Sequence, residues 1–180
     1  MKRGLVISAG IVLVVMVIGI GYFYMKKGEA EATQAPKSKL TKSEEAKVKT
    51  EISNSFYSTK GKIPDYQNMS ENELMQEVHV MTHQKVAAEE KWGSSEITKA
   101  KVDQLYNVIK NKQFTDHDLQ TMLLSILQPW KKGDFSNAVK AHNEIWKYQH
   151  GDVGKATRLL TAEEEKKYID QHFNQNKSNG

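Results

Sequence analysis

Two histidines, His79 and His83, are four residues apart in a segment whose apolar residues recur with helical spacing. Side chains four residues apart lie on the same face of an α-helix, so both imidazoles can reach one metal ion. A third histidine, His142, falls in the middle of the apolar face of a later predicted helix. Its ring should be dehydrated and neutral, and its two nitrogen atoms need partners inside the protein.

These histidines, with a carboxylate such as Glu90 on the same helical stripe, predict a zinc-type site between two facing helices. A structural role is the competing interpretation. The His-x-x-x-His pair lacks the glutamate of a metalloprotease helix, and His142 can simply bond a backbone carbonyl. Our leading interpretation therefore has no cofactor, and the alternative is a divalent metal bound by His79, His83, His142 and Glu90.

Catalysis is not predicted. The chain has no cysteine, which excludes thiol chemistry, thiolate zinc sites and disulfides. Asp116, His117 and Asp118 resemble an acid-base cluster, but they fall in the first turn of a predicted helix, where carboxylates serve as caps. No serine elbow or pair of inward-facing carboxylates can be placed. A metal-dependent hydrolase remains a third alternative because a bound metal can activate water.

Residues 1–25 predict a transmembrane signal anchor. The run Leu5–Tyr24 holds 20 residues without a charge, which is long enough to cross a bilayer at about 1.5 Å per residue. A cleaved signal peptide is the alternative, because Ala30-Glu31-Ala32 resembles a cleavage site, although signal peptides have shorter apolar stretches. We expect a single-pass protein of the cell membrane with its carboxyl-terminal domain outside the cytoplasm.

Residues 26–62 predict a flexible basic stalk. Residues 1–62 hold 11 Lys and Arg against 5 Asp and Glu, whereas residues 63–180 hold 15 against 17. The positive charge therefore belongs to the stalk, where it favours a membrane surface, and a nucleic-acid partner is not predicted. A capping box at Thr41 begins a narrow amphipathic helix, which should lie on the main domain, pair with another copy, or fray.

Residues 63–175 predict an all-α domain, a compact bundle of about five short helices, followed by a loose tail at 176–180. Capping boxes begin at Ser70 and Thr161. The five predicted helices span residues 70–92, from 98 onward, 115–129, 135–149 and 161–173. We expect a core that includes Trp92, Trp130 and Trp146.

Three segments carry a resemblance to a known family: MTHQKVAAEEKWG (81–93), GDFSNAVKAHNEIW (133–146) and HGDVGKATRLLTAEEEKKYI (150–169). They resemble an uncharacterised family of small membrane-anchored proteins from low-GC Gram-positive bacteria, a domain of unknown function. The likeness covers residues 69–173 and implies a bacterial envelope setting. It implies no activity and no site residues.

The leading functional interpretation is a membrane-anchored, extracytoplasmic interaction module of the bacterial envelope. It would bind another envelope protein or a second copy of itself, without catalysis. The alternative is a metal- or small-ligand-binding helical domain that uses His79, His83 and His142.

Overall fold

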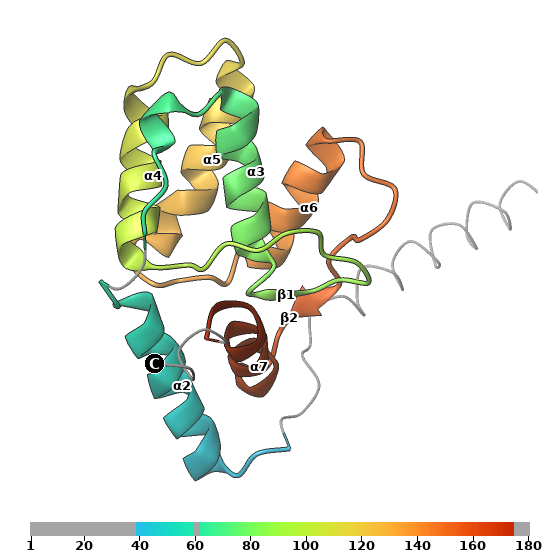
Figure 1. Ribbon diagram of the computed structural model, residues 1–180. Helices are drawn as coiled ribbons and strands as arrows, with labels where there is room; N and C mark the ends of the chain where they lie inside the picture. The colour runs from blue at the N-terminus through green and yellow to red at the C-terminus, as the bar shows by residue number, and fades with distance from the viewer. Residues whose placement is uncertain (1–38, 60–61, 175–180) are drawn as a thin grey trace, which may run out of the picture. The chain divides into compact units, whose positions relative to one another are not determined.

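The structure is a computed structural model that describes residues 39–59 and 62–174 (Figure 1). The predicted membrane span at Leu5–Tyr24 and the tail at 176–180 lie outside these residues. Within the described ranges, no helix is both long and apolar enough to cross a membrane. The elements in chain order are α2 (Lys42–Phe56), the 3-10 turn η1 (Tyr66–Asn68), α3 (Glu71–Thr82), β1 (Val86–Ala87), α4 (Lys99–Asn111), α5 (His117–Trp130), α6 (Ala138–Tyr148), β2 (Arg158–Leu159) and α7 (Ala162–Phe173).

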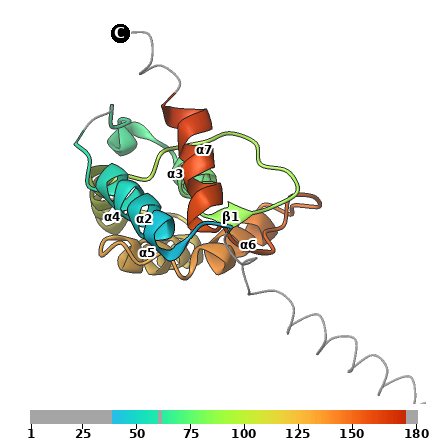
Figure 2. The same cartoon turned by 90° about the horizontal axis from the view of Figure 1, so that it is seen from below.

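The described part of the chain is mostly helical, which confirms the predicted fold class. Helices α3 to α6 pack together, and α2 and α7 lie side by side against them (Figures 1 and 2). The sheet consists of β1 and β2, which pair antiparallel with Val86 opposite Leu159. The two short strands connect the region after α3 with the segment before α7, so they bring distant parts of the chain together. Helix α2 lies on the domain, which is one of the three placements predicted for it.

The predicted helix starts are confirmed where side-chain caps define them. Thr41, Ser70 and Thr161 each form a complete capping box with the glutamate three residues later. Thr98 caps α4 through the backbone N–H of Lys101. A side-chain oxygen at these positions satisfies a backbone N–H group that has no partner inside the helix, so a short local pattern is sufficient to begin the helix.

The predicted end of the first domain helix at Trp92 is wrong, because α3 ends at Thr82. The next three residues form tight turns rather than a helix, and Val86 then enters the sheet. The ammonium of Lys91 donates to the carbonyl oxygens of His83 and Val86, at 3.0 and 3.2 Å. Side-chain donors of this kind satisfy the carbonyls that a helix leaves free at its end. Lys85 also forms an ion pair with Glu165 of α7, 80 residues away, a contact that helical periodicity does not register. With these contacts α3 ends ten residues before the predicted end.

Three smaller boundaries also differ from the prediction. Asp116, not Thr115, caps α5 by accepting from the backbone N–H of Leu119. Pro129 occupies the last turn of α5 instead of stopping the helix before it. Between the predicted helices at 135–149 and 161–173, Arg158 and Leu159 form strand β2.

The tryptophans do not all belong to the core. Trp130 is fully buried, as predicted, and its indole N–H donates to the side chain of Asn137 at 2.7 Å. Trp92 is 70% exposed, so its assignment to the core is wrong. Trp146 is half-buried and lies at the wall of a surface pocket. Because α3 ends early, Trp92 stands on a loop instead of on the apolar face of a helix.

Candidate metal centre

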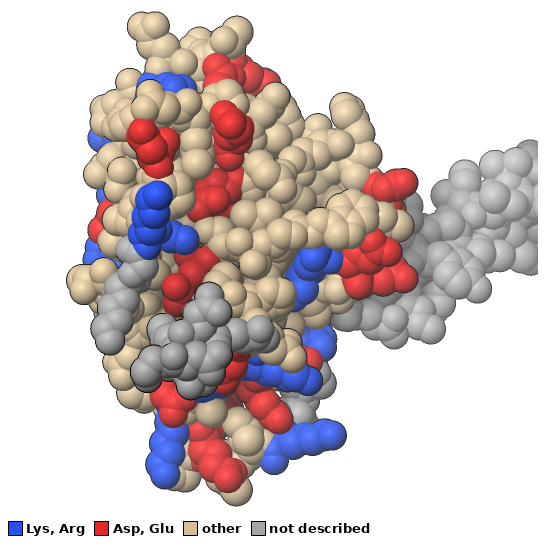
Figure 3. Space-filling model, in the orientation of Figure 1, with Lys and Arg blue, Asp and Glu red and all other residues tan. Residues whose placement is uncertain are grey.

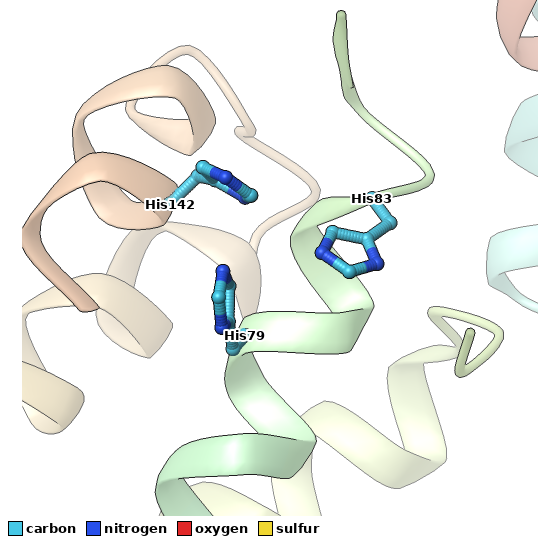
Figure 4. Close-up of side chains that lie close together, drawn as sticks. All are labelled: His79, His83 and His142. Atoms are coloured by element: carbon cyan, nitrogen blue, oxygen red, sulfur yellow. The ribbon is translucent and has the colours of Figure 1, made fainter. Parts of the chain in front are cut away.

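The three predicted histidines lie together in the structure. His79 stands on α3, His83 is the residue that follows its last turn, and His142 comes from α6, which packs against α3 (Figure 4). The ring centroids are 4.6 Å apart for His79 and His142, 5.2 Å for His79 and His83, and 5.4 Å for His83 and His142. His83 keeps a right-handed helical conformation, so the four-residue spacing holds although the helix ends before it.

The nitrogen atoms of the three rings are close enough to share one ion. One ring nitrogen from each histidine lies within 4.8 Å of the other two. A tetrahedral ion with Zn–N bonds of about 2.0–2.1 Å requires ligand nitrogens about 3.4 Å apart. The atoms must therefore approach one another by at most about 1.5 Å, a distance that side-chain rotations can cover. We name His79, His83 and His142 the histidine triad.

The backbone fixes the orientation of the His83 ring. Its Nδ1 atom lies 2.9 Å from the carbonyl oxygen of Gly93. A carbonyl oxygen only accepts, so Nδ1 carries the proton and Nε2 of the neutral ring keeps a free lone pair. Metal-binding histidines are commonly oriented in this way, by donating the other ring N–H to a carbonyl. His83 is therefore arranged as a ligand through Nε2.

His142 is buried and both of its ring nitrogens have partners. Nε2 lies 3.0 Å from the carbonyl oxygen of Gly154, and Nδ1 lies 2.8 Å from the hydroxyl of Thr82. Nε2 must donate to the carbonyl, so Nδ1 of the neutral ring is an acceptor. The Thr82 hydroxyl has one proton and also lies 2.5 Å from the carbonyl oxygen of His79, so it can donate to only one of these two acceptors. Binding a metal through Nε2 would break the bond to Gly154 and shift the proton to Nδ1, which would then donate to Thr82. That exchange costs about one hydrogen bond, or 0.5–1.5 kcal/mol.

His79 contributes a nitrogen atom without a partner. Its Nε2 atom is buried and makes no hydrogen bond in the described part of the chain. A buried polar atom left unpaired costs roughly 1–3 kcal/mol, so such atoms are rare unless they have a function. A metal ion at the histidine triad would give this nitrogen a partner.

All three rings are neutral at pH 7. Burial lowers the pKa of His83 to about 4; the hydrogen bond to Gly93 opposes this shift, and the positive charge of Lys91 adds to it. Burial also lowers the pKa of His142 to about 4 and, less strongly, the pKa of His79. Only a neutral imidazole binds a metal. The three rings therefore need to release no proton when a metal binds at neutral pH.

The histidine triad lines a surface pocket of about 320 Å³. Glu90, the fourth predicted ligand, lies on the wall of this pocket with an exposed side chain, and the structure does not bring it into the group of three nitrogens. Its predicted place on the helical stripe depended on α3 continuing past Thr82. An ion held by the triad would have three protein ligands and a fourth position facing the pocket, as in zinc sites that exchange ligands.

Several residues that orient the site were missed by sequence reasoning. The carbonyl oxygens of Gly93 and Gly154 have no sequence signal, because any residue supplies a carbonyl. Thr82 stands beside His83 in the chain, but its hydroxyl serves His142, 60 residues away. Lys91, which donates to the carbonyl oxygen of His83, falls within the predicted helix at 70–92, and nothing in the sequence indicates this contact. Gln149 and Gln76 meet at the pocket through a 2.8 Å hydrogen bond.

Comparison with known proteins identifies a family for the chain but no activity. No curated protein and no solved structure matches the chain significantly. A family model described as a family of unknown function, DUF6241, matches residues 78–170, which is just over half of the chain. The matched range contains the whole histidine triad and ends within α7. The chain therefore belongs to the DUF6241 family.

Proposed function

We propose that this domain binds a zinc-type divalent metal ion through His79, His83 and His142. The observation that carries the proposal is the meeting of three imidazoles, from α3, the residue that follows it and α6, at one pocket, with a buried Nε2 atom on His79 that has no hydrogen-bond partner among the described residues. Neutral imidazole ligands suit zinc, copper, nickel and iron, and three of them with one open position are typical of zinc. The proposed role is binding, without a catalytic step.

We propose further that the domain is displayed outside the cytoplasmic membrane. The uncharged run Leu5–Tyr24 supports a retained membrane anchor, and the order of short basic tail, apolar run and long polar domain supports an external domain. The resemblance to membrane-anchored proteins of bacterial envelopes agrees with this placement.

A protein-binding role is the second candidate. One observation favours it: Trp92 and Val153, two exposed apolar side chains, both line the pocket that contains the histidine triad. Exposed aromatic residues are enriched in contact surfaces. A partner that covers this pocket would be compatible with a metal beneath it.

The experiment is metal binding by the full-length chain, purified in mild detergent because of its apolar first segment. After dialysis against buffered zinc and cobalt, we expect one equivalent of either metal per chain by elemental analysis. His79→Gln, His83→Gln and His142→Gln should each lower the affinity by at least about 100-fold, because each removes one of three ligands.

The matched controls are His117→Gln and His150→Gln, which also remove one histidine each. His117 is the first residue of α5 and does not line the pocket, and His150 is an exposed residue that lines it. Both variants should bind one equivalent like the parent chain. Equal loss in control and triad variants, or no stoichiometric metal in the parent chain, would refute the proposal.

A further inference from the structure

The pocket in front of the histidine triad has two aromatic walls. Trp92 and Trp146 both line it, and Trp92 is 70% exposed. A large side chain with that exposure has little packing to account for its presence, whereas ligand pockets are typically lined by aromatic residues. The pocket volume of about 320 Å³ is at the lower end of the range for small-molecule sites. It would suit a ligand of one or two rings.

Contacts with the backbone fix the position of the Trp146 indole. The indole N–H of Trp146 donates to the carbonyl oxygen of Val153 at 2.7 Å. The same indole lies against Gly151, where an added Cβ atom would be only 2.3 Å from Nε1. Only glycine leaves room for the ring in this position. The wall is therefore held in place before any ligand arrives.

A second glycine, Gly154, packs against the segment that carries Trp92. Gly154 has a φ of +86°, and a Cβ atom there would be 2.7 Å from the carbonyl oxygen of Glu90. The loop that carries Glu90 and Trp92 thus lies directly against the loop that follows α6. Gly93, next to Trp92, also holds His83 by its carbonyl oxygen. The aromatic wall and the metal ligand therefore belong to one short segment.

The charges around the pocket disfavour an anionic ligand. Glu90 and Asp152 line it, and no Lys or Arg is among its described lining residues. Figure 3 shows acidic side chains at this edge of the molecule, beside the connection between α6 and β2. Glu90 and Asp152 would repel an anionic fourth ligand and would not repel a neutral one.

We propose that the metal at the histidine triad takes, as its fourth ligand, an uncharged small molecule with an imidazole-type nitrogen donor and a flat apolar group that packs against Trp92 and Trp146. This inference rests on the proposed metal binding and names the ligand class of the same site. The nitrogen donor follows from the preference of zinc-type ions for imidazole over neutral oxygen ligands. The flat group follows from the two indole walls, since stacked aromatic pairs are favourable beyond the area they bury.

The test uses the full-length chain loaded with cobalt, whose visible absorption reports the coordination of the ion. The probes are imidazole, 4-phenylimidazole and benzoate. We expect 4-phenylimidazole to change the spectrum at a concentration at least about tenfold lower than imidazole, because its second ring buries apolar area against the tryptophans. Benzoate, with the same ring but a negative charge, should bind more weakly than 4-phenylimidazole.

Substitutions distinguish the contribution of the aromatic residues from that of the metal ligands. Trp92→Ala should remove most of the preference for 4-phenylimidazole over imidazole without changing cobalt binding. Tyr57→Ala, a matched change at an exposed aromatic residue outside the pocket, should leave the preference intact. Glu90→Gln should strengthen benzoate binding by removing a negative charge from the wall.

The outcomes distinguish the two proposals. A chain that binds no cobalt at the triad overturns the metal proposal and this inference together. A chain that binds cobalt, but whose spectrum does not respond to the nitrogen donors, overturns only the inference. Equal affinity for the two imidazoles, tighter binding of benzoate, or a Trp92→Ala variant that keeps the full preference would also overturn it.

Discussion

Acidification from pH 7 to pH 4 should lower the free energy of unfolding of the metal-free protein by several kcal/mol. In the folded chain the pKa of both His83 and His142 is about 4 because the rings are buried. In the unfolded chain a histidine has a pKa of about 6.5. As the pH falls below 6.5, the unfolded chain binds protons that the folded chain does not bind, so the free energy of unfolding decreases between about pH 6.5 and pH 4. The difference is worth about 3 kcal/mol for each ring.

The measurement is urea unfolding of the chelator-treated chain at a series of pH values. Carboxylates also titrate near pH 4, so the informative quantity is the difference between the parent chain and His83→Gln. The variant keeps an amide that can donate to Gly93 but removes one titrating ring, so it should lose markedly less stability on acidification. His117→Gln serves as the control and should follow the parent chain. The same pH dependence in all three proteins would contradict the account of the buried rings.

Removing Glu165 should destabilise the fold by about 3–5 kcal/mol. Glu165 on α7 forms an ion pair with Lys85, and the two residues are each only 8% exposed. The Gln84 side chain donates to the same carboxylate at 3.2 Å, and the Lys85 ammonium lies 4.1 Å from the centre of the Phe135 ring. Glu165→Ala leaves the ammonium buried without its counter-charge, which costs far more than the intact pair contributes.

The control for Glu165→Ala is a substitution in a solvent-exposed ion pair. Lys140 and Glu144 on α6 are 3.6 Å apart, with side chains 77% and 40% exposed, and Lys140→Ala should cost less than about 1 kcal/mol. Lys85→Met combined with Glu165→Leu should recover much of the stability, because it removes both buried charges. Urea unfolding measures all of these. A Glu165→Ala variant no less stable than Lys140→Ala would show that the buried pair does not hold α7 to the domain.

The sequence predicted those parts of the fold that depend on neighbours in the chain. Ser70 and Thr161 begin helices because a side chain three residues away completes each cap. The end of α3 was missed because it depends on Glu165, about 80 residues further along the chain, which draws Lys85 and Gln84 inward. Trp92 was misplaced for the same reason. Periodicity reports which face a residue would occupy on a helix, but it does not report where tertiary contacts end that helix.

The candidate site was predicted in part by the same reasoning. The prediction for His79 and His83 rested only on their four-residue spacing, which the structure keeps. The prediction for His142 rested only on its place on an apolar helix face, and His142 is buried in the structure. Their meeting depends on the packing of α3 against α6, which no local pattern specifies. The contacts that orient the rings, with Gly93 and Gly154, come from backbone carbonyls and cannot be recognised by residue type.

The most direct measurement of the central claim is X-ray absorption at the metal edge of the zinc-loaded full-length chain. The account predicts a four-coordinate ion with three imidazole nitrogens at about 2.0 Å and one further light ligand. His142→Gln should lower the number of imidazole nitrogens bound to the ion below three or abolish metal binding. A six-coordinate spectrum of oxygen ligands alone, or one unchanged in His142→Gln, would contradict the claim that the histidine triad holds the metal.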